Sequence, residues 1–91
     1  MKKYDFYADP GHGWLKVKRQ ELIELGIEGE ISAYSYQRGD YVYLEEDADA
    51  PLFQDAWEEE HQEKFMNKWI RYHQADYDSR IRQYEPFKPE G

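Results

Sequence analysis

Residues 31–47, ISAYSYQRGDYVYLEED, constrain the fold more than any other stretch of this 91-residue chain. Tyrosines occupy every second position on both sides of a short turn, Arg38-Gly39-Asp40. They are Tyr34, Tyr36, Tyr41 and Tyr43. Aromatic residues that alternate around a glycine-containing turn are typical of a β-hairpin. We therefore expect residues 31–46 to form the central hairpin of the fold, and we interpret Arg38-Gly39-Asp40 as its turn, not as an adhesion tripeptide.

The sequence before this hairpin predicts two further strands and a short helix. Residues 3–8 and 14–17 alternate in polarity, and the Pro/Gly loop between them suits a reversal of the chain. Residues 18–25 have helical spacing instead. Gly26 follows them and fits the left-handed stop after a helix.

The sequence after the hairpin predicts a second helix that does not continue to the end of the chain. Asp49 is the expected helix cap, with Pro51 in the first turn. The apolar stripe of this helix breaks near residues 60–64. Residues 65–73 fit a helix and a strand equally well. Residues 80–85 alternate enough to predict an edge element.

These elements predict an α+β fold, with an antiparallel sheet of four or more strands centred on the tyrosine hairpin and two helices packed on it. The length suits a single domain over residues 1–91. We expect residues 86–91 to form a flexible tail, because two prolines and a glycine lie in it. The expected core consists of Leu15, Val17, Leu22, Leu25, Val42, Leu44, Leu52, Phe53 and Trp57.

Composition narrows the class of protein. Aromatic residues make up 18% of the chain, which is typical of a packed core and not of disorder. The chain has no cysteine, so disulfides and thiolate metal sites are excluded, and a reducing compartment is favoured. No run approaches the ~20 apolar residues of a membrane span. We expect a cytoplasmic protein without membrane contact.

The formal net charge is −8, and its distribution matters more than its total. Residues 45–63 hold nine acids and no Lys or Arg, whereas the rest of the chain holds eleven acids and twelve bases. In a helix the acids of residues 55–63 are spaced about 3 Å apart, close to the ~3.4 Å charge spacing of one DNA strand. Such a surface could occupy a cationic groove built for nucleic acid, or it could be a solvated helix face.

The loop Asp9-Pro10-Gly11-His12-Gly13-Trp14 is the most unusual run of the chain. A carboxylate and an imidazole three residues apart could form an acid–base pair, or the loop could hold a ligand. In the alternative interpretation Asp9 caps the turn, His12 is solvated and Trp14 belongs to the core.

We expect no metal and no cofactor. His12, His61 and His73 match no metal-binding spacing, and the acids of residues 45–49 lack the order of a calcium loop. Arginines and lysines beside Trp14 or Tyr84 could contact nucleic acid, but the negative charge of the chain opposes this. The expected partner is therefore not nucleic acid itself.

Several segments together resemble short proteins of bacteriophages and bacterial mobile elements that share a DPGHGWL-type segment. These segments are residues 9–15 (DPGHGWL), residues 31–36 (ISAYSY), residues 43–47 (YLEED) with 50–53 (APLF), and residues 78–82 (DSRIR) with Tyr84 and Phe87. The resemblance covers about two thirds of the chain and implies no activity. It implies a bacterial host, in which small acidic proteins that block host defence or nucleic-acid enzymes are expected.

The leading hypothesis is an accessory protein that inhibits a basic, nucleic-acid-handling or defence protein through an acidic surface, with tyrosines as rigid contact area. The expected contact residues are Asp55, Glu58, Glu59, Glu63, Tyr34, Tyr36, Tyr41 and Tyr43. The alternative is a small enzyme or ligand-binding domain that uses Asp9, His12 and Trp14. A homo-oligomer that pairs hairpin edges is a third possibility, so the sequence leaves the partner and the oligomeric state open.

Overall fold

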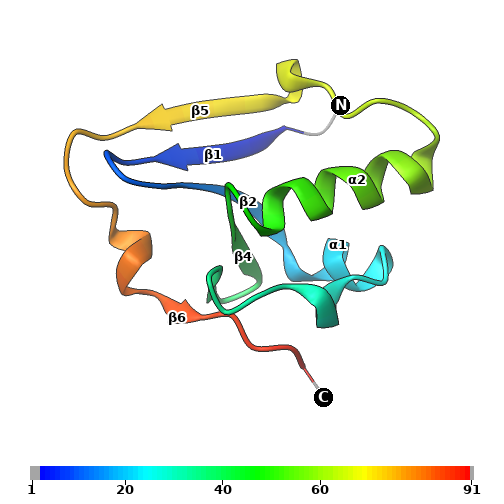
Figure 1. Cartoon of the computed structure of the whole chain (residues 1–91), viewed down its shortest axis with the longest axis horizontal. Coiled ribbons are helices and arrows are strands. Elements are labelled where there is room, and N and C mark those ends of the chain that lie inside the picture. The colour runs from blue at the N-terminus through cyan, green and yellow to red at the C-terminus, as the bar shows by residue number, and fades with distance from the viewer. Residues whose placement is uncertain (1–2, 91) are drawn as a thin grey trace.

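The computed structural model describes residues 3–90 and has the predicted α+β architecture, with one six-stranded sheet and two helices (Figure 1). The strands are β1 (Tyr4–Ala8), β2 (Gly13–Lys18), β3 (Tyr36–Arg38), β4 (Tyr41–Glu45), β5 (Ile70–Gln74) and β6 (Glu85–Pro86). The helices are α1 (Arg19–Glu24) and α2 (Asp49–His61), and short 3₁₀ helices cover Glu28–Glu30, Asn67–Trp69 and Arg80–Gln83. Within residues 3–90 no helix is long and apolar enough to cross a membrane.

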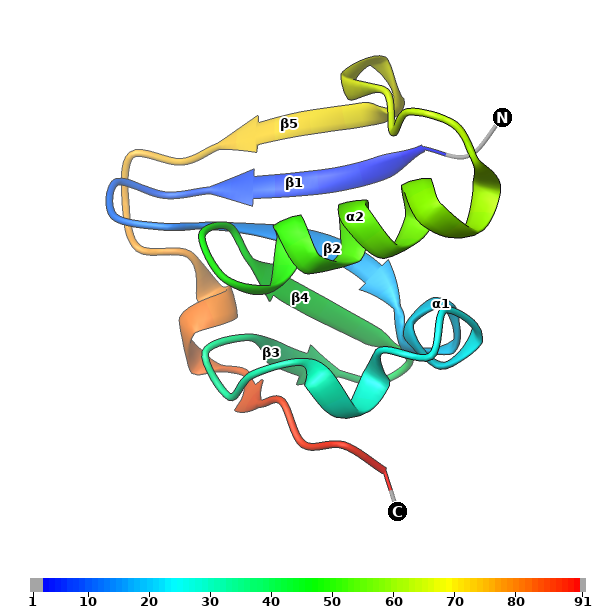
Figure 2. The same ribbon diagram turned by 45° about the vertical axis from the view of Figure 1, so that its right-hand side comes forward.

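The strand order is β5-β1-β2-β4-β3-β6, and every neighbouring pair is antiparallel except β1 and β5. The hairpin between β3 and β4 turns at Gly39, whose φ of +60° explains the glycine. Residues 65–73, which fitted both a helix and a strand, form a 3₁₀ turn and then β5. This strand pairs in parallel with the otherwise free edge of β1 (Figure 2).

One face of the sheet, here called the helix face, carries the main core. Both views show α2 lying across this face (Figures 1 and 2). The buried strand residues meet Leu22 of α1 and Phe53 of α2. They are Leu15, Val17, Val42 and Leu44, as predicted. Leu25, Leu52 and Trp57, also predicted for the core, are only partly buried at its edge.

The opposite face, here called the tyrosine face, carries a second cluster. Successive strand residues point to opposite sides of a sheet, so the register places five aromatic side chains together on this face. They are Tyr7, Trp14, Tyr36, Tyr41 and Tyr43. Ile81, from the 3₁₀ helix Arg80–Gln83, packs against Trp14 and Tyr43. This face is therefore covered at one end by the segment that follows β5.

Helix α2 ends at His61, which confirms the predicted break. Gln62 adopts the left-handed conformation, with a φ of 52°. The chain then turns back, so that the rings of Phe65 and Trp69 lie 5.3 and 5.0 Å from the ring of Trp57. The change of apolar face seen in the sequence is thus a change of direction of the chain.

Two predicted boundaries are wrong, for one physical reason. Residues 33–35 form a turn instead of the first hairpin strand, and Asp49 does not cap α2 with its side chain. The Asp49 carboxylate instead accepts hydrogen bonds from the backbone N–H of Ser32 (3.1 and 3.2 Å) and from the hydroxyls of Ser32 (2.7 Å) and Ser35 (2.5 Å). These long-range bonds compete with both the strand and the cap.

The segment expected to form a tail, residues 86–91, makes specific contacts over its described part. Phe87 is buried, and its N–H donates to the Ser35 carbonyl oxygen at 2.8 Å. The guanidinium of Arg19 lies 4.7 Å from the Phe87 ring centre, and the Lys88 N–H donates to the side-chain oxygen of Gln37. Gly91 lies outside the described residues. Phe87 therefore belongs to the main core.

Replacing Phe87 with Ala should lower the free energy of unfolding by about 3 kcal/mol, because it removes a buried ring and leaves a cavity. Urea unfolding followed by circular dichroism measures this value. Pro89→Ala is the control, since Pro89 is exposed in the same segment and its loss should change the free energy by less than about 0.5 kcal/mol. Equal stability of the two variants would show that the segment is not anchored.

Candidate functional site

The loop between β1 and β2 is built around the carboxylate of Asp9, whose side chain is 0% exposed. The backbone N–H groups of Gly11 and His12 donate to Oδ1 at 3.1 and 2.9 Å, and the N–H of Ser79 donates to Oδ2 at 2.9 Å. Gly13 is required for packing, because a Cβ there would lie 2.5 Å from the ring of Phe6. The loop is thus closely fitted on both sides.

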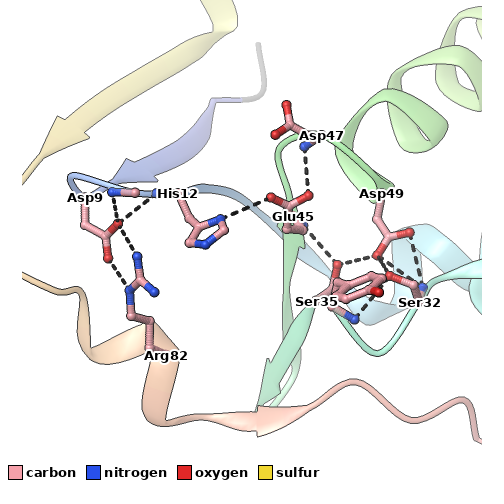
Figure 3. A network of polar contacts seen from close by, with 10 residues as sticks. Asp9, His12, Ser32, Ser35, Glu45, Asp47, Asp49 and Arg82 are labelled. Atoms are coloured by element: carbon pink, nitrogen blue, oxygen red, sulfur yellow. Dashed lines mark hydrogen bonds and ion pairs between the residues drawn. The ribbon is translucent and has the colours of Figure 1, made fainter.

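Arg82 completes this arrangement (Figure 3). Its Nε and Nη2 donate to Oδ2 and Oδ1 of Asp9 at 2.6 and 2.8 Å, which is the bidentate geometry of a strong ion pair. The hydrogen bonds from Arg82 and from the backbone hold the pKa of Asp9 far below its usual range, despite burial. The carboxylate is therefore a permanently charged structural group and a poor proton acceptor.

His12 does not pair with Asp9 through its ring. Asp9 binds the backbone of His12, whereas the imidazole Nδ1 lies 3.6 Å from Oε2 of Glu45 (Figure 3). The side chain of His12 is 50% exposed. The acid–base pair of Asp9 and His12, one of the two interpretations of this loop, is therefore replaced by a contact between His12 and Glu45.

A pocket of about 410 Å³ lies beside His12. Its lining comes from four separate parts of the chain: His12, Trp14, Ala33, Tyr34, Tyr36, Glu45, Asp47, Ala48 and Arg82. Trp14 is only 2% exposed, and its indole Nε1 has no hydrogen-bond partner within residues 3–90. An unpaired buried N–H is unfavourable, and this one belongs to a side chain that lines the pocket, although the nitrogen itself is inaccessible.

A second buried carboxylate, Asp49, forms the far side of this network (Figure 3). Ser35 links the two sides, because its hydroxyl donates to Asp49 and accepts the N–H of Glu45 at 2.9 Å. The turn that these bonds hold places Tyr34 at the pocket with 75% of its surface exposed. Sequence analysis missed Arg82, Glu45 and Ser35, since only the fold brings them to the loop.

The four acids expected to contact a partner differ in their surroundings. Glu58 accepts the N–H of Phe65 at 2.9 Å and so stabilises the turn after α2. Glu63 lies beyond the end of the helix, whereas Asp55 and Glu59 lie within it. Asp55, Glu59 and Glu63 are exposed, as is Glu60, and none of these four forms an ion pair with another residue of the range 3–90. We call these four residues the acidic surface.

The tyrosines expected at the same interface lie elsewhere. Tyr36, Tyr41 and Tyr43 lie on the tyrosine face, across the sheet from α2, and Tyr43 is buried there. Burial raises the pKa of Tyr43 to about 12. Tyr34 lies at the pocket. The acids and the tyrosines therefore do not form one continuous surface.

The three histidines lie on different elements. His61 stacks on Trp57 at 4.3 Å, and His73 stacks on Tyr7 at 4.7 Å while its Nε2 lies 2.9 Å from Asp5. Within residues 3–90 no three His, Asp or Glu side chains are grouped so that they could hold a metal ion.

Replacing Asp9 with Asn should lower the melting temperature by about 10 °C or more at neutral pH, because it leaves Arg82 and three backbone donors without a charged acceptor. The pKa of Asp9 is lower in the folded protein than in the unfolded chain. Its stabilising effect is therefore complete above about pH 4, begins to be lost below that value, and disappears only near the much lower pKa of the folded protein. The gap between the melting temperatures of the two proteins, measured from about pH 2 to 7, should therefore be constant above about pH 4 and narrow steadily below it.

Asp78→Asn is the matched control, because Asp78 is exposed and lies 4.0 Å from the same guanidinium. Its melting temperature should stay close to that of the native chain. A gap between the native chain and Asp9→Asn that is as large at low pH as at neutral pH would contradict the role of the carboxylate charge.

Comparison with known proteins finds no family model that matches the chain, and no match among curated proteins or solved structures.

Proposed function

We propose that this chain is a small accessory protein that binds a basic protein through the acidic surface. The observation that carries the proposal is that Asp55, Glu59, Glu60 and Glu63 are exposed and form no ion pair within residues 3–90. Unpaired like charges repel one another, and a cationic partner relieves this repulsion. Charge complementarity of this kind mainly supplies partner selection and fast association.

The expected partner is a protein that handles nucleic acid or defends a bacterial host. The charge spacing supports a partner that handles nucleic acid. At about 1.5 Å of rise per residue, three acids of α2 lie within less than 10 Å along the helix axis. This density is comparable to that of phosphates along a strand. The origin in a phage or mobile element and the inhibitory effect belong to the proposal through the sequence resemblance alone. The cytoplasmic location belongs to it because the chain has no cysteine, which favours a reducing compartment.

Changing Asp55 to Asn and Glu59, Glu60 and Glu63 to Gln should reduce capture of the partner about tenfold or more, because it removes the field that attracts it. The measurement is affinity capture from nuclease-treated bacterial lysate at low and high salt, quantified by mass spectrometry. Glu58 is left unchanged because it holds the turn.

The control variant neutralises four exposed acids on other parts of the chain: Glu24, Glu30, Asp40 and Asp76. Both variants change the net charge by the same amount, so a specific partner should be lost only with the first. A partner that binds both variants equally, or that binds equally at low and high salt, would contradict the proposal.

A second candidate function is ligand binding in the pocket beside His12. The observation that favours it is the pocket itself, where His12, Trp14 and Glu45 meet from separate parts of the chain. In this hypothesis His12, Glu45 and Trp14 contact the ligand, and Asp9 with Arg82 holds the loop in place.

The indole N–H resonance of Trp14 should shift when a ligand enters the pocket, because Trp14 lines the pocket and the ligand changes the surroundings of its ring. Heteronuclear NMR spectra recorded with a panel of nucleosides and amino acids test this. The resonance of Trp57, which does not line this pocket, is the internal control. His12→Ala should abolish the shift, and spectra in which no compound moves the Trp14 resonance would count against this function.

A further inference from the structure

On the tyrosine face, the segment after β5 and the strands that it packs against form an open strip. Two adjoining pockets of about 580 and 310 Å³ lie along it, and Lys16 lines both. The first is bordered by Tyr7, Tyr43, Tyr77 and Tyr84, and the second by Tyr41 and Arg71. Because Lys16 lines both, the two pockets are neighbours, and we call them together the strip.

The charge of this strip is opposite to that of the whole chain. The register places Lys16, Lys18, Arg38 and Arg71 on the tyrosine face, and Arg80 borders the larger pocket. The acids that line the two pockets are Asp5, Glu21 and Asp78. Asp5 is already bound by Arg71 at 3.1 Å and by His73 at 2.9 Å. The remaining bases give the strip a local excess of positive charge.

Aromatic rings lie beside these lysine and arginine side chains. The ammonium of Lys16 lies 4.1 Å from the ring centre of Tyr41, and the guanidinium of Arg38 lies 5.1 Å from that of Tyr84. His73 and Tyr7 stack with an angle of 15° between their planes. Tyr77 is 75% exposed and lines the larger pocket. Cationic side chains thus lie against aromatic rings of the strip.

We propose that this strip binds single-stranded nucleic acid. Nucleobases stack on exposed tyrosine rings without sequence preference, and phosphates pair with the neighbouring lysine and arginine side chains. Arg71 on β5 and Arg38 on β3 are four strand spacings apart, which is about 19 Å at ~4.8 Å per strand. This length accommodates several consecutive nucleotides. A shallow strip with the exposed ring of Tyr77 and the partly exposed rings of Tyr7, Tyr41 and Tyr84 suits unstacked bases and offers nothing that enters the groove of a duplex.

The net charge of −8 does not prevent this binding, because the acids of α2 lie on the other side of the sheet. The molecule measures 20 Å along its shortest axis, the axis down which Figure 1 is viewed. At physiological salt, charges are screened over about 8 Å. The field of the acidic surface is therefore weak at the strip. This inference does not depend on the proposed protein partner.

The test uses the full chain and a fluorescein-labelled oligothymidine of about 12 nucleotides, with fluorescence anisotropy as the readout. Binding should weaken as salt rises, with a slope of log K against log salt of about −3, from four or five cations at ~0.7 each. The variant Arg38→Gln/Arg80→Gln should bind about tenfold more weakly and should flatten the slope by about 1.4. The control Lys64→Gln/Lys68→Gln removes two exposed charges outside the strip and should bind like the native chain.

A second pair of variants separates stacking from charge. Tyr77→Ala should weaken binding about fivefold or more, because it removes a stacking ring without changing the charge. Tyr72→Ala is its control, since Tyr72 is 65% exposed but packs with Phe6 on the helix face. Both tyrosines are exposed enough that neither variant should unfold the chain.

Binding of the oligothymidine that depends on Arg38, Arg80 and Tyr77 supports the proposal. It would be overturned by the absence of an anisotropy change at low salt, or by control variants that weaken binding as much as the strip variants. Polyglutamate that competes as well as the oligothymidine, with no effect of Tyr77→Ala, would overturn it too, because the strip would then recognise only negative charge.

Discussion

The ion pair between Asp9 and Arg82 holds together segments that the sheet alone does not connect. Asp9 ends the first strand, and Arg82 lies in the 3₁₀ helix after the last long strand. Their bidentate contact, with the N–H of Ser79 on the same carboxylate, fixes residues 79–82 against the tyrosine face. Ile81 is buried there as a result, and the aromatic cluster at this end of the face is closed.

Asp49 likewise holds distant segments together, on the other side of the hairpin. A turn that forms no ladder hydrogen bonds must satisfy its backbone groups in some other way, and a buried carboxylate accepts several donors at once. Asp49 accepts four hydrogen bonds from Ser32 and Ser35, and the hydroxyl of Ser35 in turn accepts the N–H of Glu45. Two buried acids thus determine the shape of the pocket between them. The lowered pKa of Asp9 makes it a poor proton acceptor, and the carboxylate oxygens of Asp49 are occupied by structural hydrogen bonds.

The parts of the fold that the sequence predicts well are those with local signals. The tyrosine alternation around Gly39 predicts β3 and β4, and the loss of apolar periodicity near residue 60 predicts the end of α2. The missed features depend on contacts between distant residues. Asp49 looks like a helix cap in the sequence because its true partners, Ser35 and Ser32, lie 14 and 17 positions away and give no local signal. The pairing of Asp9 with Arg82 spans 73 positions. The candidate site was located only in part, because His12 and Trp14 stand out in the sequence whereas Glu45 and Arg82 do not.

The distribution of charge explains why a total of −8 describes neither face of the molecule. A sheet covered by helices on one side has two surfaces that its own thickness separates. Alternation along each strand sends Val17, Val42 and Leu44 to one side and Lys16, Lys18 and Tyr41 to the other. The acids of α2 follow the helix to the outside of the first surface, while the strand lysines and arginines remain on the second. Salt screens charges over a shorter distance than the one that separates the two outer surfaces of the molecule. Each surface therefore attracts partners according to its own residues.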